Sequence, residues 1–147
     1  MAGRRKGYAI TMSEIVSIGS IHYITMGKTN GITPKDGYPS RNKYFVVLGR
    51  DKAGRLYGGV VFNSRINQKL PVHIQMYQYP IPKASYTFLS HDSFIDCSTL
   101  MSVSASQLST NTLCGELTPE HLGYVLDAVR QSGTIPPIKL REYGIIP

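Results

Sequence analysis

The chain has 147 residues, of which 41% are hydrophobic and 17% charged, and its formal net charge is +7. This length predicts one domain, and the composition excludes a collagen-like, coiled-coil or disordered chain. The two cysteines, Cys97 and Cys114, do not form a C-x-x-C pair and are expected to be reduced thiols. The basic start lacks the apolar region of a signal peptide, and no stretch resembles a membrane span, so we expect a cytoplasmic protein without membrane association.

Charge is divided unevenly between the two halves of the chain. Residues 1–83 hold thirteen basic and three acidic side chains, whereas residues 84–147 hold three basic and six acidic ones. The basic half is a candidate surface for a polyanion such as RNA. A surface that only keeps the protein in solution is the alternative.

The first predicted elements are strands separated by a long loop. Residues 1–12 are basic and irregular and predict a loose arm. β-Branched and aromatic residues predict a strand over 15–24, and three glycines and two prolines predict a loop over 27–40. The runs 43–48 and 56–62 flank a glycine-containing turn and predict a β-hairpin. Three shorter strands are predicted at residues 71–79, 94–95 and 100–103.

One helix is predicted near the end of the chain. Thr118 suits the N-cap, and Gly133 suits the end of the helix, after which residues 134–147 are expected to form a tail. Between them, four apolar residues recur at helical spacing: Leu122, Val125, Leu126 and Val129. The sequence therefore predicts a mainly β (α+β) fold in a single domain, 1–147, with its core over about 15–132. The expected architecture is a small antiparallel barrel with a C-terminal helix.

The order of these elements resembles the PemK/MazF-like toxin family. Residues 19–23, Gly-Ser-Ile-His-Tyr, are similar to the opening strand of that family, and Arg41 before the run 44–48 is similar to the start of its next strand. Residues 60–64, Val-Val-Phe-Asn-Ser, resemble an apolar run that ends in Thr-Ser in many members. The same run resembles equally the barrel of ToxN, a related toxin.

The resemblance implies a fold, a reaction and partners. Members have an SH3-like barrel, and several cleave single-stranded RNA through attack of a 2′-OH on the adjacent phosphate, with no metal or other cofactor. They form homodimers and are silenced by a cognate antitoxin, which is a protein or an RNA. We therefore expect a toxin-type endoribonuclease. The histidines and cysteines of the chain lack the spacing of a zinc site, which agrees with metal-independent chemistry.

A later stretch resembles the same family with fewer charges. Residues 93–98, Ser-Phe-Ile-Asp-Cys-Ser, follow its Ser-x-Val-x-Cys pattern. However, Ser98, Met101 and Gln107 stand where members carry charged residues. These departures favour the alternative function, a catalytically inactive barrel of the same lineage that binds RNA or a protein partner. A peptide-binding adaptor of SH3-like type is a third hypothesis.

Four residues are candidates for catalysis, which needs a base, an acid and positive charge at the phosphate. Arg41 has a planar guanidinium that suits a phosphate, and a solvated loop arginine is the alternative interpretation. Ser64 offers a hydroxyl donor at a strand end, where turn formation is the alternative. His91 and Asp96 are candidates for proton transfer, although adjacent residues of an extended chain favour a loop turn begun by Asp92 and Ser93 over a direct pair of His91 with Asp92.

Five further residues are candidates for RNA binding. Lys43 and Arg65 supply positive charge for phosphates, and Asn63 supplies an amide next to Ser64 in the sequence. Tyr38 and Tyr57 supply rings on which single-stranded bases stack. Tyrosine is also a favourable strand residue, so a purely structural role for these rings is the alternative.

Overall fold

The computed structural model describes residues 16–147, and an antiparallel sheet of seven strands forms its centre. The strands are β1 (Ser20–Gly27), β2 (Ser40–Arg50), β3 (Leu56–Asn63), β4 (Gln78–Ile81), β5 (Ser93–Asp96), β6 (Met101–Ser104) and β7 (Leu113–Glu116). Their hydrogen-bonded order is β4-β5-β3-β2-β1-β7, and β6 pairs with β3 beside this path. The mainly β class is therefore confirmed. Within residues 16–147 the path ends at β4 and at β7, so the sheet is open.

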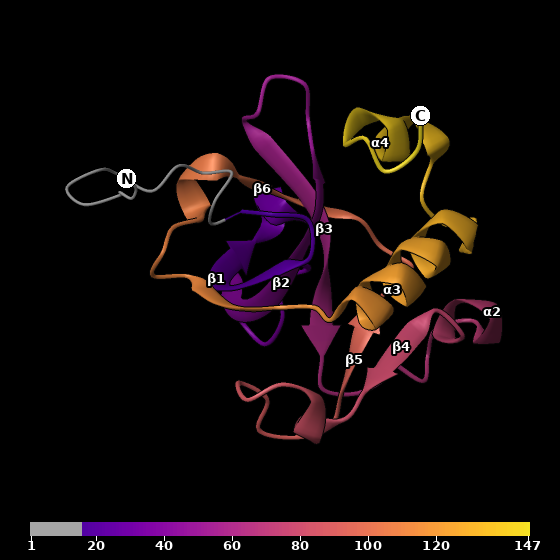
Figure 1. The fold of residues 1–147 in the computed structure, drawn as a ribbon. Helices are drawn as coiled ribbons and strands as arrows, with labels where there is room; N and C mark the ends of the chain where they lie inside the picture. Colours follow the sequence, from indigo (N-terminus) through magenta and orange to yellow (C-terminus); the bar gives the residue numbers. More distant parts are fainter. Residues whose placement is uncertain (1–15) are drawn as a thin grey trace.

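The predicted hairpin of β2 and β3 organises the sheet (Figure 1). Its turn is held by the Asp51 carboxylate, which accepts a hydrogen bond from the Arg55 backbone N–H at 2.9 Å. The first half of β3 pairs with β6 and its last residues pair with β5, so two strands converge on it besides β2. Gly59 is required here, because a Cβ on it would lie 1.9 Å from the Val46 carbonyl oxygen.

β5 and β6 pair with one edge of β3, and β2 pairs with its other edge. Residues 28–39 form the long connection between β1 and β2, which the sequence predicted over 27–40, and contain one 3-10 turn, η1 (Lys28–Asn30). Two further 3-10 turns, η2 (Lys83–Ser85) and η3 (Ala105–Gln107), lie in the later connections. The expected arm, 1–12, lies outside the described residues.

The predicted helix is α3 (Pro119–Gln131), and it begins and ends as its sequence indicates. The Thr118 hydroxyl accepts a hydrogen bond from the His121 N–H at 3.1 Å, which caps the first turn. Gly133 follows with a φ of +72°, the left-handed conformation that ends many helices. Val125 and Val129 are buried in the same apolar cluster as Ile95 of β5, so α3 packs on the sheet.

The prediction of a C-terminal tail over 134–147 is wrong. Residues after Pro136 form α4 (Pro137–Glu142), because proline is accepted in the first helical turn even though it cannot continue the preceding helix. Tyr143 is only 4% exposed and packs on the hairpin, where a Cβ on Gly58 would lie 2.6 Å from its ring. Figure 1 shows α4 beside the hairpin. The core therefore extends beyond residue 132 into the C-terminal segment.

The predicted strand 71–79 is also wrong in part. Val72–Gln75 form a single helical turn, α2, which Pro71 begins, and the strand β4 starts only at Gln78. β4 contains Pro80, which the sheet accepts because β4 is an edge strand paired with β5 alone. No helix within residues 16–147 has both the length and the apolar character needed to cross a bilayer.

Two apolar clusters lie on opposite faces of the sheet. Alternation along β2 sends Val46 and Leu48 into one cluster, with α3 and α4, and sends Phe45 and Val47 into the other. The second cluster is completed by Leu108 and by other residues of β1, β3 and β6. Because both faces are covered in the middle of the sheet, the ends of β2 and β3 are where polar side chains can gather.

Candidate functional site

A cleft of about 1090 Å³ lies at the start of β2 and the end of β3. It brings together side chains that lie between Tyr23 and Asp96 in the sequence, from strands β1 to β5 and from the loops that connect them. The predicted site residues that line it are Arg41, Lys43, Asn63, Ser64, Arg65, His91 and Asp96. The β2–β3 and β3–β5 pairings account for this assembly, because β3 lies between the other two strands.

The cleft is strongly basic. Five of its lining side chains are basic: Lys35, Arg41, Lys43, Arg65 and Lys69. Among the described residues that line it, Asp96 carries the one carboxylate. A hollow with this excess of positive charge attracts an anionic ligand and raises its local concentration.

Lys43 is the cation most closely held by the cleft. Its Nζ donates a hydrogen bond to Asn63 Oδ1 at 2.6 Å, across the β2–β3 pair. Burial lowers the pKa of Lys43, and the nearby charges of Arg41 and Lys35 lower it further, while Asp96 opposes them. An ammonium that is partly stripped of water and repelled by its neighbours gains more from a bound phosphate than a fully solvated one does.

Arg41 joins the cleft to the long connection between β1 and β2. Its Nη1 donates a hydrogen bond to the Thr33 carbonyl oxygen at 2.9 Å. One nitrogen of the guanidinium is thus engaged, and the side chain is exposed at the cleft. Lys35 from the same connection also lines the cleft, so this loop contributes to the site.

Asp96 is oriented by a set of donors on one side. Its Oδ1 accepts hydrogen bonds from Gln78 Nε2 at 2.8 Å, from the Ser98 N–H at 2.9 Å and from Ser98 Oγ at 2.6 Å. Its Oδ2 accepts no hydrogen bond from residues 16–147. Gln78 is only 6% exposed, so the carboxylate has one oxygen fixed by the fold and one oxygen open to a ligand.

His91 lies on the exposed loop before β5. Its Nδ1 is 2.9 Å from the Asp92 carbonyl oxygen, and a carbonyl can only accept, so Nδ1 carries the hydrogen. In the neutral ring, the second nitrogen, Nε2, is therefore a hydrogen-bond acceptor. The Asp92 carboxylate accepts a hydrogen bond from the Lys83 N–H at 2.8 Å and does not pair with His91, as expected for adjacent residues in a turn.

The end of β3 supplies the remaining predicted groups. Asn63 is half-buried and bonded to Lys43, whereas Ser64 and Arg65 are exposed and follow the last paired residue of the strand. Ser64 and Arg65 both line the cleft, on the side that continues into residues 66–70. They place a hydroxyl and a guanidinium within the same basic hollow.

Two predicted RNA contacts lie elsewhere. Tyr57 is only 3% exposed and belongs to the second apolar cluster, so its assignment as an RNA-stacking residue is wrong. It occupies that cluster because β3 alternates, and Tyr57 shares a face with Val61. Tyr38 is 70% exposed in the β1–β2 connection but does not line the cleft.

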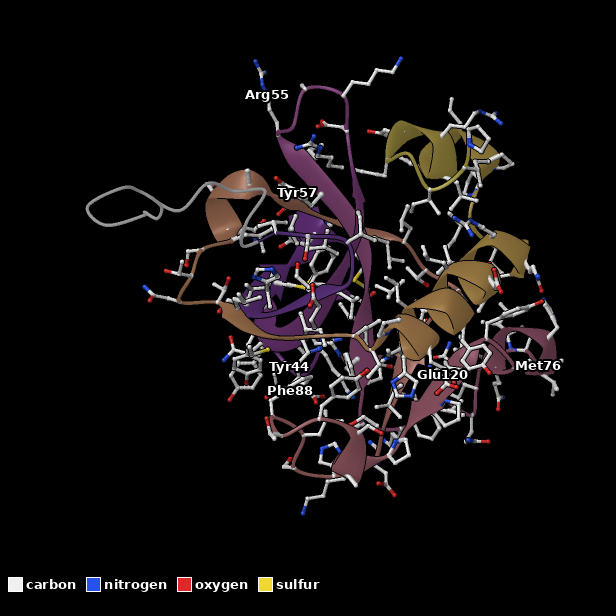
Figure 2. The ribbon with its side chains drawn as sticks, in the orientation of Figure 1. Tyr44, Arg55, Tyr57, Met76, Phe88 and Glu120 are labelled. Carbon is white, nitrogen blue, oxygen red and sulfur yellow. The ribbon has the colours of Figure 1, made fainter. Side chains whose placement is uncertain are left out.

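Aromatic residues that sequence reasoning did not assign to the site line the cleft instead. Tyr23 and Tyr44 face each other across β1 and β2 with ring centroids 4.5 Å apart, and Phe88 lies 4.6 Å beyond Tyr44. Figure 2 shows Tyr44 and Phe88 side by side. Predicting that Tyr23 and Tyr44 meet would have required the register of β1 on β2, which the sequence of neither strand reveals alone.

Comparison with known proteins adds no relative. No protein-family model matches the chain, and no curated protein is significantly similar to it. Within residues 16–147, no group of three or more His, Cys, Asp or Glu side chains is placed to hold a metal ion. The geometry of the cleft is therefore the basis for assigning a function.

Proposed function

We propose that this chain is a PemK/MazF-like endoribonuclease that cleaves single-stranded RNA, with its open antiparallel sheet as the counterpart of the SH3-like barrel of that family. The observation that carries the proposal is the content of one cleft: an imidazole, a carboxylate and five basic side chains. A phosphodiester needs positive charge around its phosphate, and cleavage by a 2′-OH needs two groups that transfer protons.

In the proposed reaction, Asp96 Oδ2 takes the proton from the 2′-OH, and the 2′-oxygen attacks the adjacent phosphorus. The bond from phosphorus to the 5′-oxygen then breaks, and protonated His91 gives its Nε2 proton to that leaving oxygen. The products are a 2′,3′-cyclic phosphate and a 5′-OH end. A carboxylate suits the base and an imidazolium suits the acid near neutral pH.

Charge that develops on the phosphate oxygens is met by the cations of the cleft. Arg41 and Lys43 are separated by one residue on β2, so they share a face of the strand, and Arg65 follows the end of β3. We assign Lys43 and Arg41 to the phosphorane and Arg65 to a flanking phosphate. Ser64 and Asn63 add donors without adding net charge.

The test is cleavage of a labelled, mixed-sequence single-stranded RNA in EDTA. We expect cut products that end in a 2′,3′-cyclic phosphate, and no cut where the attacking nucleotide is 2′-deoxy. His91→Gln and Asp96→Asn should each lower the rate about 10²-fold to 10⁴-fold. His73→Gln and Asp127→Asn are matched controls outside the cleft lining and should leave the rate unchanged. RNA that stays intact with the wild-type protein contradicts the proposal.

RNA binding without cleavage is the second candidate. It is favoured by the hydrogen bonds that already engage Asp96 Oδ1 and by the bond from Arg41 to Thr33. In that case the wild-type protein binds the same RNA in a salt-dependent way and leaves it uncut.

We further propose a toxin role, in which a homodimer of this chain slows growth until a cognate antitoxin binds. Its support is the resemblance described from the sequence. Induced expression should slow growth, and Arg41→Ala should relieve the effect. Arg55→Ala is the matched control, because Figure 2 shows Arg55 at the hairpin tip, far from Tyr44 and Phe88 beside the cleft. Equal toxicity of wild type and Arg41→Ala would remove Arg41 from the mechanism.

A further inference from the structure

A small exposed face of β1 and β2 lies beside the cations of the cleft. The register pairs Tyr23 with Tyr44 and Thr25 with Asn42. Residues that are directly opposite in an antiparallel pair share a face, and so do alternate residues of one strand, so these four side chains form one patch. Tyr23, Asn42 and Tyr44 also line the cleft.

The patch offers an aromatic ring on a fixed support. Tyr23 is 46% exposed, and its ring packs on Tyr44 at a centroid distance of 4.5 Å. Tyr44 is held in place, because its hydroxyl donates to the Phe88 carbonyl oxygen at 3.2 Å and its ring packs on Phe88. A ring supported in this way loses little conformational freedom when another planar group stacks on it.

The patch also offers an oriented amide next to that ring. Thr25 Oγ1 donates to Asn42 Oδ1 at 2.6 Å, which fixes the plane of the amide. Asn42 Nδ2 donates to no residue within 16–147, so its two N–H groups remain for a ligand. Asn42 is exposed and stands between Arg41 and Lys43 in the sequence.

We infer that this patch is a nucleobase subsite of the cleft, in which a base of single-stranded RNA stacks on Tyr23 and places its acceptors against the Asn42 amide. The inference rests on the proposed function, because it takes RNA as the ligand. A ring together with a hydrogen-bonding amide is the combination that binds an unstacked base, and the adjacent cations hold the phosphate of the same nucleotide. The basic lining favours a nucleic acid over a peptide as the occupant.

The experiment uses full-length Asp96→Asn protein, which should bind RNA without cutting it, and single-stranded RNA that carries 2-aminopurine. We expect binding to quench the fluorescence of the 2-aminopurine, because stacking on a ring does so. Tyr23→Ala in this background should abolish the quenching and weaken binding about ten-fold. Tyr23→Phe keeps the ring and should preserve both, and Asn42→Ala should weaken binding while preserving the quenching.

Tyr124→Ala is the matched control, because Tyr124 is 51% exposed but lies outside the cleft lining. If Tyr23→Ala binds RNA and quenches it as its parent does, the subsite is overturned while the proposed function stands. If neither the wild-type nor the Asp96→Asn protein binds RNA, both are overturned. If Tyr23→Ala does not fold, the other measurements decide. Equal RNA binding by the Asp96→Asn protein with and without Asn42→Ala overturns the amide contact. Failure of the Asp96→Asn protein to quench 2-aminopurine overturns the stacking.

Discussion

At the scale of single residues, Lys43 and the two cysteines show how burial sets protonation. The folded-state pKa of Lys43 is lowered, so the unfolded chain binds more protons than the folded one. The cost of burying this lysine in its charged form therefore falls as pH rises toward 10.5. Burial has the opposite consequence for the thiols, because it raises the pKa of Cys97 to about 12 and of Cys114 to about 11. Both thiols are therefore protonated and unreactive at neutral pH.

The cysteines predict a loss of stability in alkali. Their ordinary pKa is 9.0, so between pH 9.0 and the raised values the folded state binds more protons than the unfolded state. The free energy of unfolding should fall with pH across that window, because the thiols must ionise when the chain unfolds. We expect Cys114→Ala to lose less stability than wild type between about pH 8 and about pH 10.5, as measured by urea denaturation. Parallel losses in the two proteins would contradict this account.

At the scale of elements, two glycines occupy opposite environments. One lies in the hairpin, where the backbone of the neighbouring strand is very close, and the other lies on the exposed surface of a helix. A Cβ on Gly59 would lie 1.9 Å from the Val46 carbonyl oxygen, inside the β2–β3 pair. Gly123 is exposed on α3, and a Cβ on it would meet no atom within 4 Å. Replacement of glycine by alanine should therefore change the free energy of unfolding in opposite directions at the two positions.

Gly59→Ala should lower the free energy of unfolding by about 2 kcal/mol or more, because the strands must separate to admit the methyl group. Gly123→Ala should raise it by about 0.5–1 kcal/mol, because alanine restricts the unfolded chain and favours the helix. Thermal or urea denaturation measures both. A destabilised Gly123→Ala or a neutral Gly59→Ala would show that the packing around these positions is different.

At the scale of the whole molecule, charge is concentrated at one end of the hairpin. The basic half of the sequence contains β1, β2 and β3, and all five basic side chains of the cleft come from it. The helices that cover the first apolar cluster come from the half with excess acidic residues. The uneven charge of the sequence thus becomes a local field at the cleft.

This field predicts the salt dependence of RNA binding. Five basic side chains line the cleft. If each neutralises a phosphate of a single strand, the logarithm of the association constant should fall with the logarithm of salt concentration with a slope of about −3 to −4. Lys43→Met should reduce the magnitude of that slope by about 0.7, while Lys52→Met on the hairpin turn should leave it unchanged. Titration of RNA binding at several salt concentrations measures the slope, and a slope near zero would exclude the cleft as a phosphate-binding surface.

Local signals predicted the hairpin and α3 well, since a turn glycine, an N-cap and a helical apolar stripe each act within a few residues. They failed for α4 and for residues 71–79. Pro137 is the first residue of α4, although a proline shortly after a helix usually marks the end of helical structure. Pro80 lies in a strand that accepts it because the strand is at the edge of the sheet. In each case the outcome depends on what the segment packs against.

The sequence by itself determined the mainly β class, the basic half and most of the polar groups that line the cleft, because strand patterns, turn residues and charges are local properties. Tertiary structure decided which of those groups meet. It buried Tyr57, placed Tyr23 and Asn42 beside the cations, and supplied Gln78 to orient Asp96. Register and strand order control these outcomes, and both are set by contacts between residues that are distant in the chain.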